Sequence, residues 1–388
     1  MNVPKLRFKE FKDEWSTIEL SKISSEISYG MGLPSKEYDG INKYIRITDI
    51  DENTSKYTNK DIVSPDGELE DKYIVKKNDI LFARTGASTG KTYLYDKKDG
   101  KLYYAGFLIK ANIINHDANF IFQQTHTSKY NKWIKVMSMR SGQPGINSQE
   151  YGSYKFSITS KTEEYKISKT LQLLDKKIEL QTNKIEDLKL FKLYTENSLL
   201  NSSNSIHWKK LKLNDILIEG NKEPVKNTNN FKKITIKLNL NGLEFNESKR
   251  EMSDKRPFYI REENEIIIGK QNYFNGSIAI VTKEFSGCIC SNAIMSFKVK
   301  EGYNLKYIYL YLSQKRYMKE REFLANGTGQ KELSEKEFLK FTIKVPEDSV
   351  VNNITNIIDK INKKINFENN KLNKLIELKK GLMQNMFV

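Results

Sequence analysis

A tandem repeat constrains the fold of this chain more than any single motif does. When the 388-residue sequence is aligned with itself, residues 15–23 match residues 208–216 at an offset of 193. Three further blocks follow in the same order at offsets of 186 or 187. In the last of them, 7 of 19 residues are identical between positions 174–192 and 361–379. One near-constant offset through four blocks predicts two copies of a single structural unit.

Each copy divides into a mixed part and a long helix. The mixed parts contain short β-branched and aromatic runs separated by Gly, Asn, Asp and Pro, which is typical of strands. Copy two also contains a short expected helix, at 303–323. The strand runs are 44–47, 79–82 and 93–95 in copy one, and 234–236, 265–268 and 278–281 in copy two. The long helices are expected at about 163–200 and 349–381, where neither Gly nor Pro interrupts the chain before Gly381.

The two long helices carry a narrow apolar seam with spacings of three and four residues. A seam this thin, flanked by Lys and Glu, favours a coiled coil, although an amphipathic helix packed on its own domain would show a similar pattern. Polar Gln181 and Glu368 occupy matching positions within the seam. The seam residues are Leu171, Leu174, Ile178, Gln181, Ile185 and Leu188 in copy one, and Ile361, Ile365, Glu368, Leu372 and Leu375 in copy two.

A duplicated chain can pair its two helices about a pseudo-twofold axis, which makes them antiparallel. About 30 residues at roughly 1.5 Å each then give a rod of about 45 Å with a mixed domain at each end. The predicted fold class is therefore α+β, with two mixed α/β domains and an antiparallel coiled coil. The expected segments are a domain at 1–160, a helix at 161–203, a domain at 204–346 and a helix at 347–388.

The charge of the chain points to a polyanionic partner. There are 65 Lys and Arg against 49 Asp and Glu, so the formal net charge is +16. Nucleic acid is the first candidate for such a chain, while a Lys- and Asn-rich composition is the alternative explanation of the charge. No apolar run is long enough for a membrane span, and the N-terminus lacks a secretory signal. With only two cysteines, at 288 and 290, a reducing cytoplasm is the expected compartment.

Two loops in each copy stand out as candidate binding elements. In copy one, the loop between two predicted strands reads Thr85-Gly-Ala-Ser-Thr-Gly-Lys91. It lacks the first Gly of a phosphate-binding loop and the helix after Lys91, so a basic hairpin loop is the better interpretation. Its partner in copy two spans 270–276. A second Gly-Gln loop precedes each long helix, at 140–147 and 326–334, and could read adenine through its Gln or could be a plain turn.

Nothing in the sequence argues for catalysis or for a bound metal or cofactor. His116, His126 and His207 are scattered and have no second ligand at a useful spacing. The pair Cys288 and Cys290, at strand spacing, is better placed on a buried face than on a metal. The sequence also lacks a nucleophile elbow, a zinc-protease helix and a dinucleotide fingerprint.

The order of mixed domain, long helix, mixed domain and long helix resembles a specificity subunit of a Type I restriction–modification system. The repeated Trp15 and Trp208 blocks, the strand and loop at 79–86 and the Gly-Gln loops carry this resemblance, which covers essentially the whole chain. It implies a non-catalytic subunit whose mixed domains are target-recognition domains, each reading one half of a split DNA site. It also implies that the helices act as a ruler and dock two DNA-methyltransferase subunits, with restriction subunits joining the larger assembly.

The loops and the resemblance together give a set of candidate DNA-contacting residues. Arg84, Thr85, Gly86 and Gln143 match the recurring loop positions of the family, whereas Gln271 and Asn272 depart from them. A rod of about 45 Å exceeds one turn of duplex, about 34 Å, so a bipartite site with an unread gap is expected. Because the two domains differ in their loops, the two halves of the site should differ in sequence. The candidates are Arg46, Arg84, Thr85, Gly86, Ser88, Thr89, Lys91, Arg140, Ser141, Gln143 and Asn147 in copy one, and Lys270, Gln271, Asn272, Tyr273, Asn275, Thr328, Gln330 and Lys331 in copy two.

Other functions remain open at the level of sequence. A coiled-coil rod joining two protein-binding β domains would have the same architecture, with an incidental positive charge. The chain could equally be the targeting half of a solitary or fused modification enzyme. An enzyme would have to rely on the Gly90-Lys91 loop alone.

Overall fold

The computed structural model describes residues 3–139, 143–201, 208–246, 256–324 and 332–388. The chain forms two compact units. Unit 1 comprises residues 1–183 and 369–388, and unit 2 comprises residues 184–368. Each unit therefore contains one mixed domain and a part of each of the two long helices, α5 (Lys161–Leu200) and α10 (Asp348–Asn385). Helix α5 ends at the expected residue and begins two residues earlier, while α10 continues past Gly381 to Asn385.

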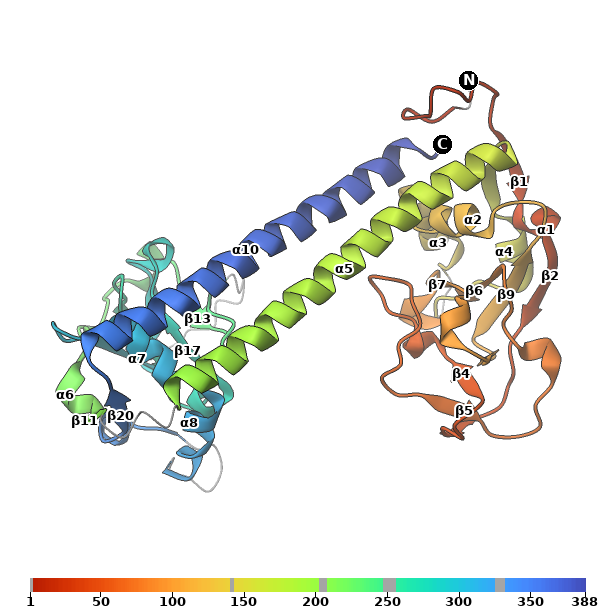
Figure 1. The fold of residues 1–388 in the computed structure, drawn as a ribbon. Coiled ribbons are helices and arrows are strands. Elements are labelled where there is room, and N and C mark those ends of the chain that lie inside the picture. Colours follow the sequence, from red (N-terminus) through yellow and green to blue (C-terminus); the bar gives the residue numbers. More distant parts are fainter. Residues whose placement is uncertain (1–2, 140–142, 202–207, 247–255, 325–331) are drawn as a thin grey trace. The chain divides into compact units, whose positions relative to one another are not determined.

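A four-stranded sheet lies at the centre of unit 1 (Figure 1). Its order is β2-β9-β6-β7, and all neighbouring strands are antiparallel. The central strand β6 is buried over its whole length, because its apolar side chains alternate between two cores on opposite faces of the sheet. The bounds are β2 (Ser24–Tyr29), β9 (Leu108–Ile113), β6 (Asp79–Ala83) and β7 (Thr92–Leu94).

Smaller elements complete unit 1. Strands β1 and β10 pair antiparallel beside α1 and α4, and β4 pairs parallel with β8. The expected strand at 44–47 ends earlier, because Arg46 opens a short 3-10 turn with Asp49. The bounds are β1 (Ser16–Glu19), α1 (Leu20–Ile23), β3 (Ser35–Glu37), β4 (Lys43–Ile45), β5 (Val63–Pro65), β8 (Leu102–Tyr104), α2 (Ala118–Gln124), α3 (Ser128–Met137), α4 (Ser148–Ser153) and β10 (Lys155–Ile158).

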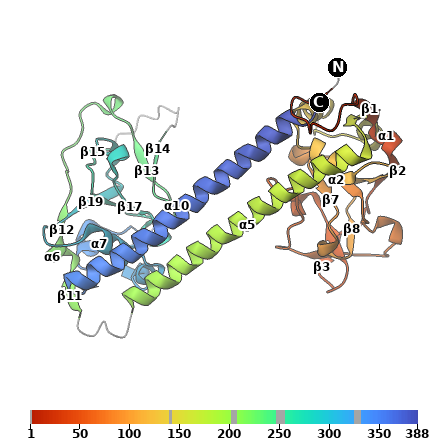
Figure 2. The same cartoon turned by 45° about the horizontal axis from the view of Figure 1, so that its top comes forward.

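Unit 2 repeats this topology. Its four-stranded sheet has the order β12-β19-β16-β17, and β11 pairs with β20 as β1 pairs with β10. Figure 2 shows the additional hairpin of β13 and β14. The bounds are β11 (Lys209–Lys212), α6 (Leu213–Ile216), β12 (Leu217–Glu219), β13 (Ile234–Ile236), β14 (Leu243–Phe245), β15 (Phe258–Ile260), β16 (Ile266–Gly269), β17 (Ile278–Ile280), β18 (Ile289–Ser291), β19 (Ile294–Val299), α7 (Leu305–Leu312), α8 (Lys315–Lys319), α9 (Glu335–Leu339) and β20 (Thr342–Val345).

Matching caps confirm the duplication at the level of single hydrogen bonds. Asp117 caps α2 by accepting from the backbone N–H three residues on, and Asn304, 187 positions later, caps α7 in the same way. Asn147 and Ser334 are a second matched pair of caps, on α4 and α9. Side-chain oxygens at these positions satisfy N–H groups that a helix start leaves without partners. The helix expected at 303–323 is divided, because the chain turns between α7 and α8.

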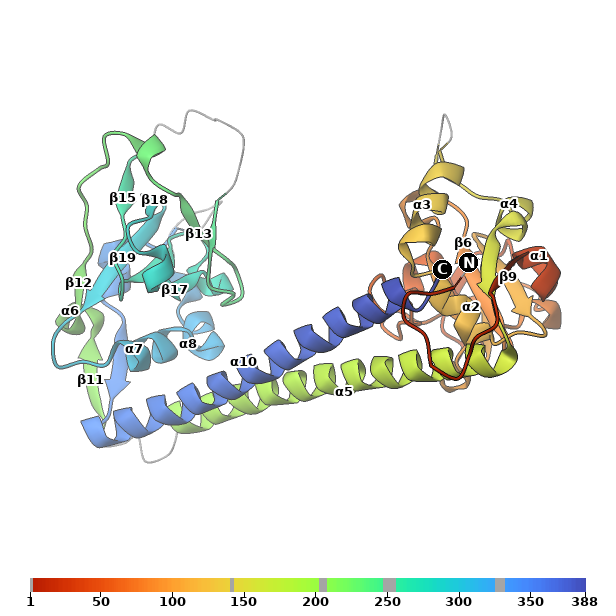
Figure 3. The same cartoon turned by 90° about the horizontal axis from the view of Figure 1, so that it is seen from above.

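The two long helices pack against each other in antiparallel fashion. In unit 1, the start of α5 lies beside the end of α10, so Ile167 and Leu171 share a core with Met383 and Phe387 (Figure 3). In unit 2, the end of α5 lies beside the start of α10, where Leu200 packs with residues 351 and 354. Helix α7 contributes to both this cluster and the sheet core of unit 2.

The predicted seam residues all lie on the packed sides of the helices. Leu171, Leu174, Gln181, Ile185, Ile365 and Glu368 are buried, and Ile178, Leu188, Ile361, Leu372 and Leu375 are half-buried. The Glu368 carboxylate lies 2.9 Å from the Lys184 ammonium and 3.1 Å from that of Lys364. These two lysines supply the positive charge that a buried carboxylate requires.

Candidate nucleic-acid interface

The two candidate loops of copy one meet at the end of strand β6. The Arg84 N–H donates to the Phe107 carbonyl at 3.0 Å, and the Arg84 carbonyl accepts from the Ile146 N–H at 2.9 Å. The Gly86 N–H donates to the carbonyl of Pro144 at 2.9 Å. The hairpin loop after β6 and the loop before α4 therefore form one surface, which neither loop could form alone.

Arg84 is held at the centre of this surface by an aromatic ring. Its guanidinium lies 4.7 Å from the centroid of the Tyr29 ring, and the Tyr29 hydroxyl accepts from the Ser148 N–H at 3.0 Å. The Arg84 Nε is buried and has no hydrogen-bond partner among the described residues. A buried donor without an acceptor is costly, and a ligand cannot reach a buried atom, so a ligand would meet the other nitrogens of this half-buried side chain.

The tip of the hairpin exposes small and polar groups. Gly86 has a φ of +72°, and an added Cβ would lie 3.2 Å from the Gln143 side-chain amide, so glycine lets the exposed Gln143 lie against the hairpin. The Thr89 hydroxyl donates to the Gly86 carbonyl at 2.7 Å, which braces the 3-10 turn containing Ser88. Lys91 lies 2.8 Å from the Glu52 carboxylate, and Glu52 is exposed.

The same backbone frame recurs in unit 2 around Lys270. The Lys270 N–H donates to Ala293 at 2.9 Å, and its carbonyl accepts from the Leu333 N–H at 2.9 Å. These are the counterparts of the Arg84 contacts with Phe107 and Ile146. The Lys270 ammonium lies 3.8 Å from Glu335. Gln271, Asn272 and Asn275 are exposed on the adjacent loop.

Three of the predicted DNA-contacting residues have structural roles. Tyr273 is fully buried and donates its hydroxyl to the Leu312 carbonyl at 2.8 Å, because the 3-10 turn at 273–275 directs its ring into the core. Arg46 is engaged by Asp49, with its Nε and Nη2 both at 2.9 Å from that carboxylate. Asn147 caps α4. Arg140, Ser141, Thr328, Gln330 and Lys331 lie outside the described residues.

Two residues of this surface were missed by sequence reasoning. Tyr29 lies at the end of β2, 55 positions before the arginine that it contacts, and no local motif marks it. Phe107 lies in the turn between β8 and β9, and the offset of 186 that aligns Arg84 with Lys270 aligns Phe107 with Ala293. This difference between the two copies, phenylalanine in one and alanine in the other, is the sequence feature that could have identified Phe107.

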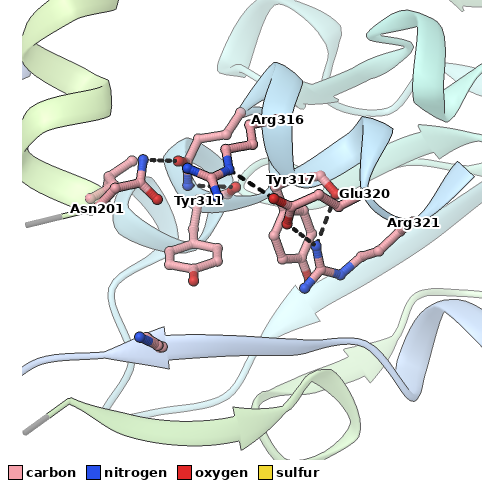
Figure 4. Close-up of a pocket in the computed structure, with 9 residues that line it drawn as sticks. Asn201, Tyr311, Arg316, Tyr317, Glu320 and Arg321 are labelled. Carbon is pink, nitrogen blue, oxygen red and sulfur yellow. Dashed lines mark hydrogen bonds and ion pairs between the residues drawn. The ribbon is translucent and has the colours of Figure 1, made fainter. Parts of the chain in front are cut away.

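A basic pocket lies elsewhere in unit 2, between the end of α5 and helix α8 (Figure 4). Asn201 and Tyr311 line it together with the charged Arg316, Glu320 and Arg321. Glu320 contacts both arginines, at 2.7 Å and 3.7 Å. Because the carboxylate already pairs with the cations that surround it, this pocket offers less unpaired positive charge than its composition indicates.

The two cysteines lie in an apolar environment, away from any metal-ligand grouping of the described residues. Cys288 and Cys290 are both buried in the apolar cluster behind β18, as their strand spacing indicated. Burial raises the pKa of Cys290 although the Arg261 Nε donates to its sulfur at 3.0 Å. Within the described ranges, no three His, Cys, Asp or Glu side chains are grouped to hold a metal ion. None of the described helices is long and apolar enough to cross a membrane.

Known proteins share both the sequence pattern and the fold. The family described as Type I restriction modification DNA specificity domain matches the chain twice, over residues 13–190 and 205–378. The structure is similar to a Type I restriction–modification system S subunit from M. genitalium, with a TM-score of 0.60 and 15% identity over 100% of this chain and 99% of that one.

A second similar chain comes from a structure concerned with complex assembly and conformational transition of the type I R-M system. It has a TM-score of 0.56 and 13% identity, over 96% of this chain and 97% of that one. At these identities the two structures support the fold, whereas the two sequence matches together span most of the chain. The chain therefore belongs to the family of Type I restriction–modification DNA specificity subunits and carries two specificity domains in tandem.

Proposed function

We propose that this chain reads an asymmetric, bipartite DNA site with an unread gap and directs a partner methyltransferase to it. The observation that carries this proposal is the frame repeated around Arg84 and Lys270. The same two backbone hydrogen bonds hold a basic residue at the end of the central strand in each unit, while the surrounding loop residues differ. Two similar frames with different tips suit two different half-sites.

The chemistry of the tips agrees with reading double-stranded DNA. Arginine donates two hydrogen bonds to guanine, and Gln143 in unit 1 or Gln271 in unit 2 could pair with adenine in the same bidentate manner. The net charge of +16 supplies affinity for phosphates, which depends on salt and not on sequence. The chain itself contributes recognition, and the methyl transfer belongs to the partner enzyme.

The long helices are the proposed docking surface for two methyltransferase subunits, with restriction subunits joining the complete complex. Their outer faces expose large apolar side chains in addition to Lys and Glu. Examples are Leu180, Leu190 and Tyr194 on α5 and Phe367 on α10. Exposed apolar residues that recur along a helix pair are typical of surfaces that bind proteins.

A methylation map tests the proposal. The chain is co-expressed with its methyltransferase subunit in a methylation-free host, and every modified base is located. We expect an asymmetric gapped motif that disappears when this chain is omitted. No chain-dependent methylation from a well-assembled complex would favour a purely structural rod.

Single substitutions then assign the half-sites. Arg84→Ala should relax one half of the motif and Lys270→Ala the other, because each bidentate base contact contributes about 1–3 kcal/mol of discrimination. Arg316→Ala is the control, since that arginine is an exposed basic residue of unit 2 that lies on α8, outside the loop that follows β16. Equal loss of both halves in either variant would contradict independent reading by the two units.

A further inference from the structure

Phe107 is an exposed aromatic side chain on a rigid turn beside Arg84. Its side chain is 62% exposed, although phenylalanine is the kind of residue that folding normally buries. Its backbone carbonyl accepts the Arg84 N–H at 3.0 Å. Phe107 therefore lies opposite Arg84 at the end of β6, where the hairpin loop begins.

The turn that presents Phe107 is held on every side. The Gly106 N–H donates to Met31 at 2.7 Å, and the Leu108 N–H donates to Ala105 at 2.8 Å. The neighbouring Gly30 approaches so closely that an added Cβ would lie 2.3 Å from the Ala105 carbonyl oxygen. A ring fixed in this way loses little backbone freedom when it meets a partner, which favours binding.

The duplicated unit shows that the fold does not require an aromatic side chain at this position. Ala293 occupies the equivalent place in unit 2, and its carbonyl accepts the Lys270 N–H at 2.9 Å, as Phe107 accepts that of Arg84. The turn thus keeps its backbone contact with alanine. The exposed ring of Phe107 is an addition that only unit 1 carries.

We propose that Phe107 stacks against a base step in the half-site read by unit 1 and partly unstacks it, and that unit 2 lacks this contact. Apolar side chains inserted between bases deform DNA and make its local flexibility part of the recognition. The cationic Arg84 beside the ring supplies charge complementary to the phosphates. The inference rests on the proposed DNA-reading function and assigns to it a specific mode of contact.

The experiment uses the purified complex with its methyltransferase subunit. The probe is a 40-base-pair duplex carrying the mapped motif, with 2-aminopurine placed at each position of both half-sites in turn. Fluorescence of 2-aminopurine rises when the base is unstacked. We expect the fluorescence to rise at one base step of the half-site read by unit 1. We expect no such rise in the half-site read by unit 2.

Phe107→Ala should abolish that rise and weaken binding by roughly 5- to 150-fold, the range for loss of one stacked base. Phe107→Trp should retain the signal. Ile41→Ala removes another apolar side chain of unit 1, which is 69% exposed, and should change neither readout. Because the ring is exposed, the thermal unfolding midpoint of Phe107→Ala should match that of the wild type.

The outcomes separate this inference from the proposed function. Intact motif-specific methylation with unchanged fluorescence and affinity in Phe107→Ala would overturn the inference and leave DNA reading in place. Weaker association with the methyltransferase subunit, with unchanged fluorescence, would also overturn it and assign Phe107 to a protein contact. If the wild-type complex showed no methylation that depends on this chain, the proposed function itself would be overturned.

Discussion

Arg7→Met should destabilise unit 1, because it removes the counter-charge of a buried carboxylate. The Arg7 Nε lies 2.7 Å from the Glu163 Oε1, and its Nη2 lies 2.8 Å from Oε2. The Glu163 side chain is only 1% exposed. Removing one partner of a buried ion pair typically costs about 3–5 kcal/mol, since the remaining charge stays buried and unpaired.

The structure places the expected cost at the lower end of that range. The Thr159 hydroxyl still donates to the Glu163 Oε2 at 2.6 Å after the substitution, so we expect a loss of about 3 kcal/mol. With a urea dependence near 2–3 kcal/mol per molar, the midpoint of unit 1 should fall by roughly 1 M. The double variant Arg7→Met, Glu163→Gln should recover a large part of the loss, because no unpaired charge remains.

Tryptophan fluorescence isolates the unfolding of unit 1. Trp15 and Trp133 lie in unit 1 and Trp208 lies in unit 2, so all variants are made in a Trp208→Phe background. The matched control is Lys56→Met. Lys56 also pairs with α5, at 2.5 Å from Glu179, but the two side chains are 42% and 46% exposed. Exposed pairs contribute about 0–1 kcal/mol. If Arg7→Met cost no more than this control, the reasoning from burial would be refuted.

Two further pairs of variants test backbone conformation and the helix seam. Gly90→Ala should cost about 1–3 kcal/mol more than Gly100→Ala; both glycines have positive φ, but only at Gly90 would a Cβ lie 2.7 Å from Ile134. Equal urea midpoints for these two variants would contradict the steric argument. Leu171→Ala should lose about 2–5 kcal/mol in urea unfolding, because its side chain is fully buried between the helices. Leu173 is 54% exposed, so the stability of Leu173→Ala should stay within about 0.5 kcal/mol of the wild type. If Leu173→Ala lost as much stability as Leu171→Ala, the seam would lie on the other face of α5.

Periodic features of the fold could be predicted from the sequence, and features that depend on distant contacts could not. The seam positions from Leu171 to Leu375 follow from a spacing of three and four residues, which holds along any helix. The alternation in β6 and the Cys288 and Cys290 pair follow from the period of a strand in the same way. These patterns depend only on local geometry.

The candidate interface was predicted less completely, because side-chain direction depends on tertiary contacts. Tyr273 lies in the predicted loop but points into the core, where its hydroxyl finds the Leu312 carbonyl. Arg46 is basic and lies among the candidates, but Asp49, three residues on, neutralises its charge in part. Tyr29 escaped notice because its contact with Arg84 joins two strands that are adjacent to β9 but not to each other.

The antiparallel helix pair also affects how the protein is made. Met383, Met386 and Phe387 complete the apolar core of unit 1, whose other members end at Leu171. A ribosome that has finished α5 at Leu200 must still add 187 residues before Phe387 exists. At about 5–20 residues per second, this takes roughly 10–40 s. During that interval part of the apolar core of the first mixed domain stays exposed to solvent. A chain whose translation ends early keeps this surface exposed and is prone to aggregation and proteolysis.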